Sequence, residues 1–284
     1  MTPCEHCKHP LPPSVVRCSH CAMPGSFPNV RAAAADDEKT SLRVRYERAI
    51  EDAIARKCDN EVQELETIAS NTCAVIARSE SEVFRLATSD RQLYASYYEI
   101  NESGSRIPDG EKWDVLRSVA DVSWFPNYHK EIRFGALSSD GVGLSNYGEY
   151  SMVLADHMIA HRATVSEENT TLFMKHHNIA SDKAHELPSG YRACWTDRAK
   201  LCVAKLASRV EIGATSSSLK GLLITQGGTT ADDDFVEVHI WGTFTVRSLK
   251  RIIVHRKKGR PALTKIRALR YRLEKFQVPL EERP

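Results

Sequence analysis

The stretch FVEVHIWG, residues 235–242, decides the fold expected of this chain. In a β-strand, alternate side chains point to opposite faces. One face of this strand is aliphatic and consists of Val236, Val238 and Ile240. The other face carries a carboxylate and an imidazole between two aromatic rings, in the set Phe235, Glu237, His239 and Trp241. Such a face belongs either to an exposed sheet with cross-strand pairs or to a cleft, and the aromatic rings favour a cleft for a planar, cationic or sugar-bearing ligand.

Short apolar runs on either side of this stretch predict the rest of a sheet. Strands are expected at 132–137, 150–155, 161–166, 221–226 and 251–256, and helices at 169–178 and 191–210. Strands outnumber helices in the second half of this region. The sequence therefore predicts an α+β domain over residues 81–256, with an antiparallel or mixed sheet.

The chain opens with two CxxC pairs in CEHCKHPLPPSVVRCSHC, residues 4–21. Thiolates at this spacing can close a tetrahedral Zn2+ site, and so short a segment has almost no core without a metal. We expect a zinc ribbon over residues 1–24, with a structural Zn2+ held by Cys4, Cys7, Cys18 and Cys21. Four protein ligands leave no open coordination position, so this metal is not expected to take part in catalysis.

The segment between the ribbon and the main domain divides into two parts. Residues 25–40 contain proline, glycine and a run of alanines, which is typical of a linker. From Leu42 to Ile76, apolar residues recur every three or four positions, which predicts a helical segment within residues 41–80. This segment is either a long helix packed on the main domain, or a helical hairpin or coiled coil that forms a homodimer through residues 42–76.

The overall composition is that of an ordinary globular chain, with 284 residues, 42% hydrophobic and 27% charged residues, and a net charge of +2. The sequence has no apolar run of about 18 residues, the length that a membrane-spanning helix needs. Its N-terminus lacks a basic and then apolar signal segment. We therefore expect a cytoplasmic protein that does not cross a membrane.

The C-terminal end is locally very basic. Between Arg251 and Lys275 there are ten Lys and Arg residues against one acid, Glu274. Residues 257–284 are expected to form a basic C-terminal helix or tail. Two interpretations stay open: a solvated helix that packs by its apolar stripe, or a surface that contacts the phosphates of a nucleic acid and releases their counterions.

Four motifs follow one another along the main domain: RFGAL at 133–137, YGEYSMVL at 147–154, RATVSEENT at 162–170, and EVHIWG at 237–242 leading to SLKRIIV at 248–254. In this order they resemble the ADP-ribosyltransferase-like domains of bacterial toxins and abortive phage-resistance proteins. The resemblance covers residues 85–255. It implies an α+β fold of the split β-sandwich type, here preceded by the zinc ribbon and the long helical segment.

The resemblance also implies NAD+ bound in a cleft between two small sheets. Glu237 fits the catalytic glutamate, which accepts a hydrogen bond from the nicotinamide-ribose 2′-hydroxyl and stabilises the oxocarbenium-like charge that grows as nicotinamide departs. Arg133 matches the early basic residue that holds the NAD+ phosphates or ribose. The remaining matches are expected to stack on nicotinamide, orient the ribose or place the acceptor: Tyr147 and Tyr150, Ser166, and His239 or Trp241.

The function expected from this resemblance is that of a mono-ADP-ribosyltransferase toxin or phage-defence effector. Phe235 stands two residues before Glu237, where members that modify arginine carry Glu or Gln. This departure, the ribbon and the basic segment favour a nucleic acid as the modified target. Two alternatives stay open: a non-catalytic zinc-ribbon protein that binds nucleic acid, and an NAD+ glycohydrolase that uses water as acceptor. The sequence leaves undecided whether an antitoxin partner controls the protein.

Overall fold

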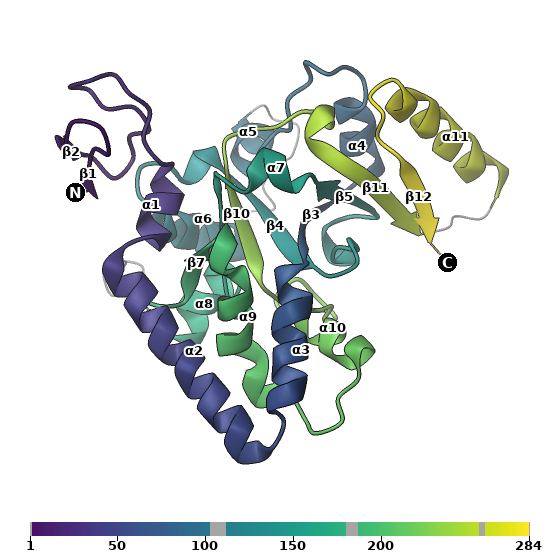
Figure 1. Ribbon diagram of the computed structural model, residues 1–284. Helices are drawn as coiled ribbons and strands as arrows, with labels where there is room; N and C mark the ends of the chain where they lie inside the picture. Colours follow the sequence, from purple (N-terminus) through teal and green to yellow (C-terminus); the bar gives the residue numbers. More distant parts are fainter. Residues whose placement is uncertain (1, 103–111, 180–186, 256–258, 284) are drawn as a thin grey trace.

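A computed structural model describes residues 2–102, 112–179, 187–255 and 259–283. Its centre is an eight-stranded mixed sheet (Figure 1). In spatial order the strands are β12 (Leu280–Arg283), β11 (Leu249–His255), β5 (Tyr150–Leu154), β3 (Cys73–Arg78), β4 (Ile132–Ser138), β10 (Glu237–Trp241), β6 (Ala163–Ser166) and β7 (Arg192–Cys194). Neighbours are antiparallel, except that β11 and β12 are parallel. This mixed sheet agrees with the expected α+β class.

One face of the sheet is covered by helices that form the main core. These are α2 (Asp36–Arg56), α3 (Asp59–Ser70), α9 (Arg198–Leu206) and α10 (Ser216–Leu223), which lie together in Figure 1. The aliphatic face of β10 points into this core, because Val236, Val238 and Ile240 are fully buried within it. The alternation of faces expected over 235–241 is therefore confirmed, although the expected strand divides at Val236 into β9 (Asp234–Phe235), which pairs with Ile224 and Thr225 outside the main sheet, and β10.

A second, smaller apolar cluster covers part of the other face. It is formed by α6 (Lys112–Trp124), α8 (Thr170–His176) and the loops that follow α6. Phe125 and Phe173 pack there against Ile132 of β4, with Phe134 and Trp241 at its margin. The polar side chains of β10 therefore lie on the face that carries this aromatic cluster.

The region expected to be a linker followed by helix is built differently. Residues 25–40 contain α1 (Pro28–Ala33) and the start of α2, because Pro28 suits the first turn of a helix and the alanines favour helix. The predicted helical stripe also runs too far. Helix α3 ends at Ser70, and Cys73 and Ile76 belong to the central strand β3, where Val75 and Ile76 are buried between β4 and β5.

Helices α2 and α3 form two consecutive helices that pack on α9. The left-handed backbone of Lys57 (φ 61°) ends α2 and turns the chain into α3. This arrangement combines the two interpretations of the segment, since a helical hairpin lies on the main domain. A homodimer through residues 42–76 stays a prediction.

Two other expected elements differ in type. In the segment 221–226, a predicted strand, the first three residues end helix α10 and only β8 (Ile224–Thr225) is extended. Thr215 caps α10 by accepting a hydrogen bond from the Ser218 amide at 3.3 Å, which favours helix locally. The helix expected at 191–210 begins with the edge strand β7, and its helical part is α9. Pairing with β6, a tertiary effect, decides the conformation of β7.

The C-terminal segment is part of the fold. The expected helix is α11 (Arg260–Glu274), which buries Ile266, Leu269 and Leu273 in the main core. The chain then adds β12 as an edge strand beside β11. The shorter helices α4 (Glu80–Leu86), α5 (Tyr97–Glu102) and α7 (Asp156–Ile159) connect strands. Across the described ranges, no helix has the length and apolarity needed to cross a membrane.

Candidate functional site

The sheet opens between β3 and β4. These strands pair only at three positions, Cys73 with Ser138, Ala74 with Leu137 and Val75 with Ala136. Beyond Val75, β3 continues beside β5, while β4 continues beside β10. A recess lies at this fork, lined by residues 75–78 of β3 and 134–136 of β4. An interrupted sheet thus creates a hollow in the middle of the molecule.

Gly135 allows the two strands to approach at the fork. A β-carbon at this position would lie 2.8 Å from the carbonyl oxygen of Val75 and 3.1 Å from Cγ1 of Ile76. Since the first contact is with backbone, a side chain cannot be accommodated by a simple rotamer change. Glycine at this point of RFGAL therefore fixes where the strands begin to separate.

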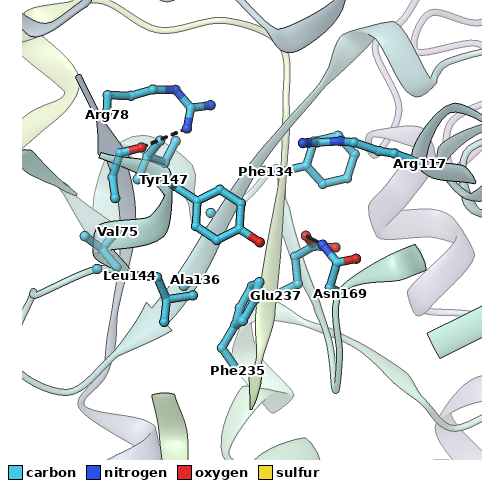
Figure 2. A pocket seen from close by; sticks show the side chains of 14 residues that line it. Val75, Arg78, Arg117, Phe134, Ala136, Leu144, Tyr147, Asn169, Phe235 and Glu237 are labelled. Atoms are coloured by element: carbon cyan, nitrogen blue, oxygen red, sulfur yellow. Dashed lines mark hydrogen bonds between the residues drawn. The ribbon is translucent and has the colours of Figure 1, made fainter. Parts of the chain in front are cut away.

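The recess combines aromatic walls with charged groups of both signs. Its side chains come from six segments of the sequence: Arg78, Arg117, Phe134, Tyr147, Asn169, and Phe235 with Glu237. Figure 2 shows the Tyr147 ring in the middle, with its hydroxyl directed toward Glu237 and with Arg78 and Arg117 on separate sides. Aromatic surface with a few convergent polar groups is typical of a small-molecule site.

Glu237 is held by three donors and is 3% exposed. Its Oε1 accepts a hydrogen bond from Nδ2 of Asn169 at 3.0 Å. Its Oε2 accepts from the backbone N–H of Thr170 at 3.1 Å and lies 3.1 Å from Nε2 of His239. A carboxylate has about four lone-pair positions, so Oε1 keeps acceptor capacity toward the recess.

Asn169 owes its orientation to the helix that it caps. Its Oδ1 accepts from the amides of Thr171 at 3.0 Å and Leu172 at 3.4 Å, as an N-cap side chain does. With the oxygen engaged at the start of α8, the NH2 group faces Glu237. The turn between β6 and α8 therefore supports the carboxylate of β10.

His239 and Ser166 lie behind Glu237, away from the recess. His239 is 1% exposed and packs at 4.8 Å against the Phe125 ring. A carboxylate can only accept, so Nε2 carries the hydrogen between His239 and Glu237. Ser166 Oγ donates to the carbonyl of Glu168 at 2.7 Å and is 3.5 Å from the same Nε2. His239 orients Glu237 directly, the Ser166 hydroxyl reaches only His239 of these two, and neither residue lines the recess.

Arg117 enters the recess from helix α6. Its guanidinium carbon lies 4.8 Å from the centroid of the Tyr97 ring and 5.2 Å from that of Phe134. Its Nε is 3.6 Å from Oδ2 of Asp121, one helical turn away. Burial opposes the charge of Arg117, but Asp121 and Glu237 outweigh it and raise the pKa of this guanidinium. A permanent positive charge therefore stands opposite Glu237.

Tyr147 is fixed by a contact between two loops. It ends the short helix η2 (Ser145–Tyr147), whose first residue donates through its amide and its hydroxyl to Oε1 of Gln226, both at 2.8 Å. Asn146 donates to Oδ1 of the buried Asp233 at 2.9 Å. Burial, reinforced by Glu237 and Asp233, raises the pKa of Tyr147, so its hydroxyl remains a hydrogen-bond donor in the recess.

Arg133 does not share the recess with Glu237. In the register of β4 and β10 it stands opposite Ile240, and directly opposed residues project to the same face. Its side chain is 3% exposed and donates to the carbonyl of Lys130 at 2.8 Å and to the carboxylate of Glu99 at 3.1 Å. The guanidinium groups at the recess come from Arg78 and Arg117 instead.

Two further expected contacts also lie elsewhere. Tyr150 is fully buried in the main core and its hydroxyl is 3.3 Å from Oε2 of Glu80. Trp241, at the far end of β10, packs near the rings of Phe27 and Tyr128, at 6.0 and 5.4 Å between centroids. Of the expected site residues, Glu237 and Tyr147 line the recess.

Sequence reasoning missed Arg78, Arg117 and Asn169. Asn169 lies inside the quoted RATVSEENT motif, where an Asn before two threonines signals a helix N-cap. Arg78 is the last residue of β3, and this strand lies within the segment predicted to be helical. Arg117 and Asp121 form an ordinary i, i+4 pair in LRSVAD, with no sequence signal that distinguishes them from surface residues.

The four ribbon cysteines form a candidate metal centre. All four Sγ atoms lie within 4.8 Å of one another, with 3.7 Å between Cys4 and Cys21 and 3.6 Å between Cys7 and Cys18. A tetrahedral site with Zn–S bonds of about 2.3 Å has edges of about 3.8 Å, so the donor set fits Zn2+. The Cys7 amide lowers the pKa of Cys4 to about 6, and the Cys21 amide likewise lowers that of Cys18.

Helix α1 connects this ribbon to the sheet. The Arg31 guanidinium donates to ribbon carbonyls, including those of Val15 at 2.7 Å and Pro13 at 2.9 Å. Two residues earlier, Nδ2 of the buried Asn29 donates to the carbonyls of Arg162 at 3.0 Å and His239 at 3.3 Å. The ribbon is therefore docked through side chains that reach β10 itself.

Much of the basic C-terminal charge is used internally. The pairs and contacts that dock α11 are Lys265 with Glu80 at 2.6 Å, Arg270 with Glu282 at 2.7 Å, and Arg272 with the carbonyl of Phe84 at 3.3 Å. Residues 256–258, part of the predicted basic surface, lie outside the described residues. Arg260 and Arg267 are exposed. The ribbon and α11 lie toward opposite ends of the molecule in Figure 1.

Comparison with protein-family models finds no family that matches this chain, and comparison with curated proteins finds no matching relative.

Proposed function

We propose that the protein is a mono-ADP-ribosyltransferase that uses NAD+ to modify a macromolecular target. One observation carries the proposal: a buried, triply held carboxylate, Glu237, faces two guanidinium groups across an aromatic recess at a fork in the sheet. The order of sequence motifs supports it as well, and the recess where β3 separates from β4 offers a cleft, although it lies within one sheet and not between the two small sheets that the resemblance implies.

The charges of the recess suit the parts of NAD+. Arg78 and Arg117 offer guanidinium forks for the diphosphate, the role that the resemblance gave to Arg133. Phe134, Tyr147 and Phe235 offer ring faces and edges for the planar nicotinamide. Glu237 Oε1 keeps a lone pair for a ribose hydroxyl.

In the proposed reaction, the bond between nicotinamide nitrogen and ribose C1′ breaks and its electron pair goes to the nicotinamide, which leaves as a neutral molecule. The ribose then carries oxocarbenium-like charge, which the fixed carboxylate of Glu237 stabilises without reorganising. A nucleophile of the acceptor attacks C1′ and releases its proton to water. Asn169, Thr170 and His239 contribute by keeping the carboxylate in place.

We favour a nucleic acid as the acceptor and a role as a toxin or phage-defence effector. Phe235 lines the recess two residues before Glu237, so this position offers no polar group for an arginine side chain. In this proposal the ribbon holds a structural Zn2+, and the exposed Arg260 and Arg267 contribute to nucleic-acid contact. The Zn2+ would fix the ribbon and takes no part in the bond-breaking step.

The test is incubation of the purified protein with NAD+ labelled in the adenylate part and a cell lysate. Glu237→Gln serves as the site variant. Glu38→Gln serves as the matched control, because Glu38 is equally buried but pairs with Arg192 away from the recess. We expect label on macromolecules with wild type and Glu38→Gln, loss of label with Glu237→Gln, and removal of label by nuclease.

The other outcomes separate the alternatives. Nicotinamide release without macromolecular label would identify an NAD+ glycohydrolase. Label that only protease removes would leave the transferase and replace the acceptor by a protein. No release and no label from wild type would overturn the enzymatic proposal and favour a binding protein.

A further inference from the structure

We propose that Asp121 is a positioning residue, which holds Arg117 toward the recess and ties helix α6 to the turn that supports Glu237. The inference rests on the proposed function, since it assigns Arg117 to substrate binding. It concerns a helix outside the motifs that carry the sequence resemblance.

The side chain of Asp121 is fully buried and interacts with donor groups from three helices. On α5, the Tyr98 hydroxyl donates to its Oδ2 at 2.8 Å. On α6, Arg117 Nε approaches the same oxygen at 3.6 Å. On α8, Thr170 Oγ1 donates to its Oδ1 at 3.0 Å. One side chain therefore fixes the mutual position of three elements on this side of the recess.

Thr170 links Asp121 directly to the catalytic candidate. Its hydroxyl is bonded to Asp121, while its backbone N–H donates to Glu237 Oε2 at 3.1 Å. If Asp121 moves, Thr170 transmits the shift to Glu237. The ion pair transmits it to Arg117. The spacing between the guanidinium and the carboxylate, on which binding of a charged substrate depends, is set by the same group.

Burying a carboxylate costs free energy unless polar partners surround it. The burial of Asp121 therefore argues that this carboxylate has a specific role. Burial raises the pKa of Asp121 and the nearby Glu237 raises it further, while Arg117 lowers it. The group keeps two hydroxyl donors and one cation as partners. Asp121 does not line the recess, so it acts through Arg117 and Thr170.

The test compares steady-state release of nicotinamide by wild type, Asp121→Asn, Arg117→Gln and the double variant. Asparagine keeps the shape of Asp121 but removes the charge that aims Arg117. We expect Asp121→Asn to raise KM for NAD+ roughly tenfold while kcat changes less than about threefold. The effects of the two substitutions should be less than additive in the double variant, because Asp121 and Arg117 are coupled through an ion pair.

Glu38→Gln is the control for loss of a buried carboxylate near an arginine, since Glu38 pairs with Arg192 remote from the recess. It should lower Tm without changing KM. If Asp121→Asn lowers Tm and leaves KM unchanged, or if its effect adds fully to that of Arg117→Gln, the inference is wrong. Should Asp121→Asn fail to fold, Tyr98→Phe removes one donor to the same oxygen, and an unchanged KM would contradict the inference in the same way.

Failure of the proposed function is distinguishable. If wild type releases no nicotinamide, the enzymatic proposal fails, and titration with ADP then tests the inference alone. ADP binding that weakens roughly tenfold in Asp121→Asn and is unchanged in Glu38→Gln would support the positioning role of Asp121. Equal affinity of wild type and Asp121→Asn, or no ADP binding by wild type, would overturn it.

Discussion

Asn169 Nδ2 donates to Glu237 Oε1 at 3.0 Å, although 68 residues separate the two in the chain. The bond joins the first residue of β10 to the N-cap of α8. A helix cap, whose usual role is local, here orients the carboxylate on which the proposed chemistry depends.

Replacing Asn169 separates these two roles. Asn169→Asp keeps an oxygen that can cap α8 but puts a second carboxylate beside Glu237. We expect nicotinamide release to fall at least roughly tenfold with little loss of helix stability, because aspartate caps as well as asparagine. Thr215→Ala, which removes the cap of α10 far from the recess, should cost about 1 kcal/mol without affecting release. Full activity of Asn169→Asp would contradict this role.

Gly135 should tolerate no side chain. Gly135→Ala places a methyl group 2.8 Å from the Val75 carbonyl, so we expect a loss of about 1–3 kcal/mol in the free energy of unfolding and a distorted fork. Gly221→Ala is the control, since its β-carbon meets nothing within 4 Å and it lies within α10. That variant should gain about 0.5–1 kcal/mol. Urea unfolding followed by circular dichroism measures both.

Arg78 and Arg133 should respond differently to loss of charge. Arg78→Gln is expected to raise KM for NAD+ because this guanidinium borders the recess, and to lower Tm only modestly because its ion pair with Glu82 is long, at 3.5 Å. Arg133→Gln should lower Tm and leave KM nearly unchanged, because its ion pair with Glu99 lies outside the recess. The opposite pattern would restore the assignment of Arg133 made from the RFGAL motif.

The ribbon should carry one metal ion per chain, held by the four-cysteine cluster. Elemental analysis of purified protein should find zinc, and Cys4→Ser should reduce its content and lower Tm. Cys58→Ser, which alters a buried thiol outside the ribbon, should keep the metal. Wild-type protein that contains no zinc and loses no stability with a chelator would be evidence against a structural metal.

The two kinds of arginine on α11 allow a test of nucleic-acid contact. Arg267 is exposed, whereas Arg270 pairs with Glu282 at 2.7 Å. We expect Arg267→Gln to weaken binding of a single-stranded oligonucleotide and to reduce the slope of log K against log salt by roughly one. Arg270→Gln should change this slope less. Equal slopes for wild type and Arg267→Gln would exclude Arg267 from the contact.

The β10 strand and its two faces were predictable because period-two alternation is visible over seven residues. Strand β3 was not, since Cys73 and Ile76 also satisfy a helical spacing and only pairing with β4 and β5 decides between the two. Because the sequence did not predict β3, it gave no reason to assign Arg78 to the site. Arg133 illustrates a second limit: which face a residue occupies depends on register with a neighbouring strand, here opposite Ile240.

The docking of the ribbon through Arg31 and Asn29 has a thermodynamic consequence for the distant recess. With a metal bound only by the folded ribbon, each tenfold rise in free Zn2+ above the dissociation constant adds about 1.4 kcal/mol to the stability of the folded state. Because Asn29 joins α1 to the backbone of His239, part of this energy protects the strand that presents Glu237 from local opening. If the ribbon binds Zn2+, the concentration of free metal therefore also affects the stability of the distant recess.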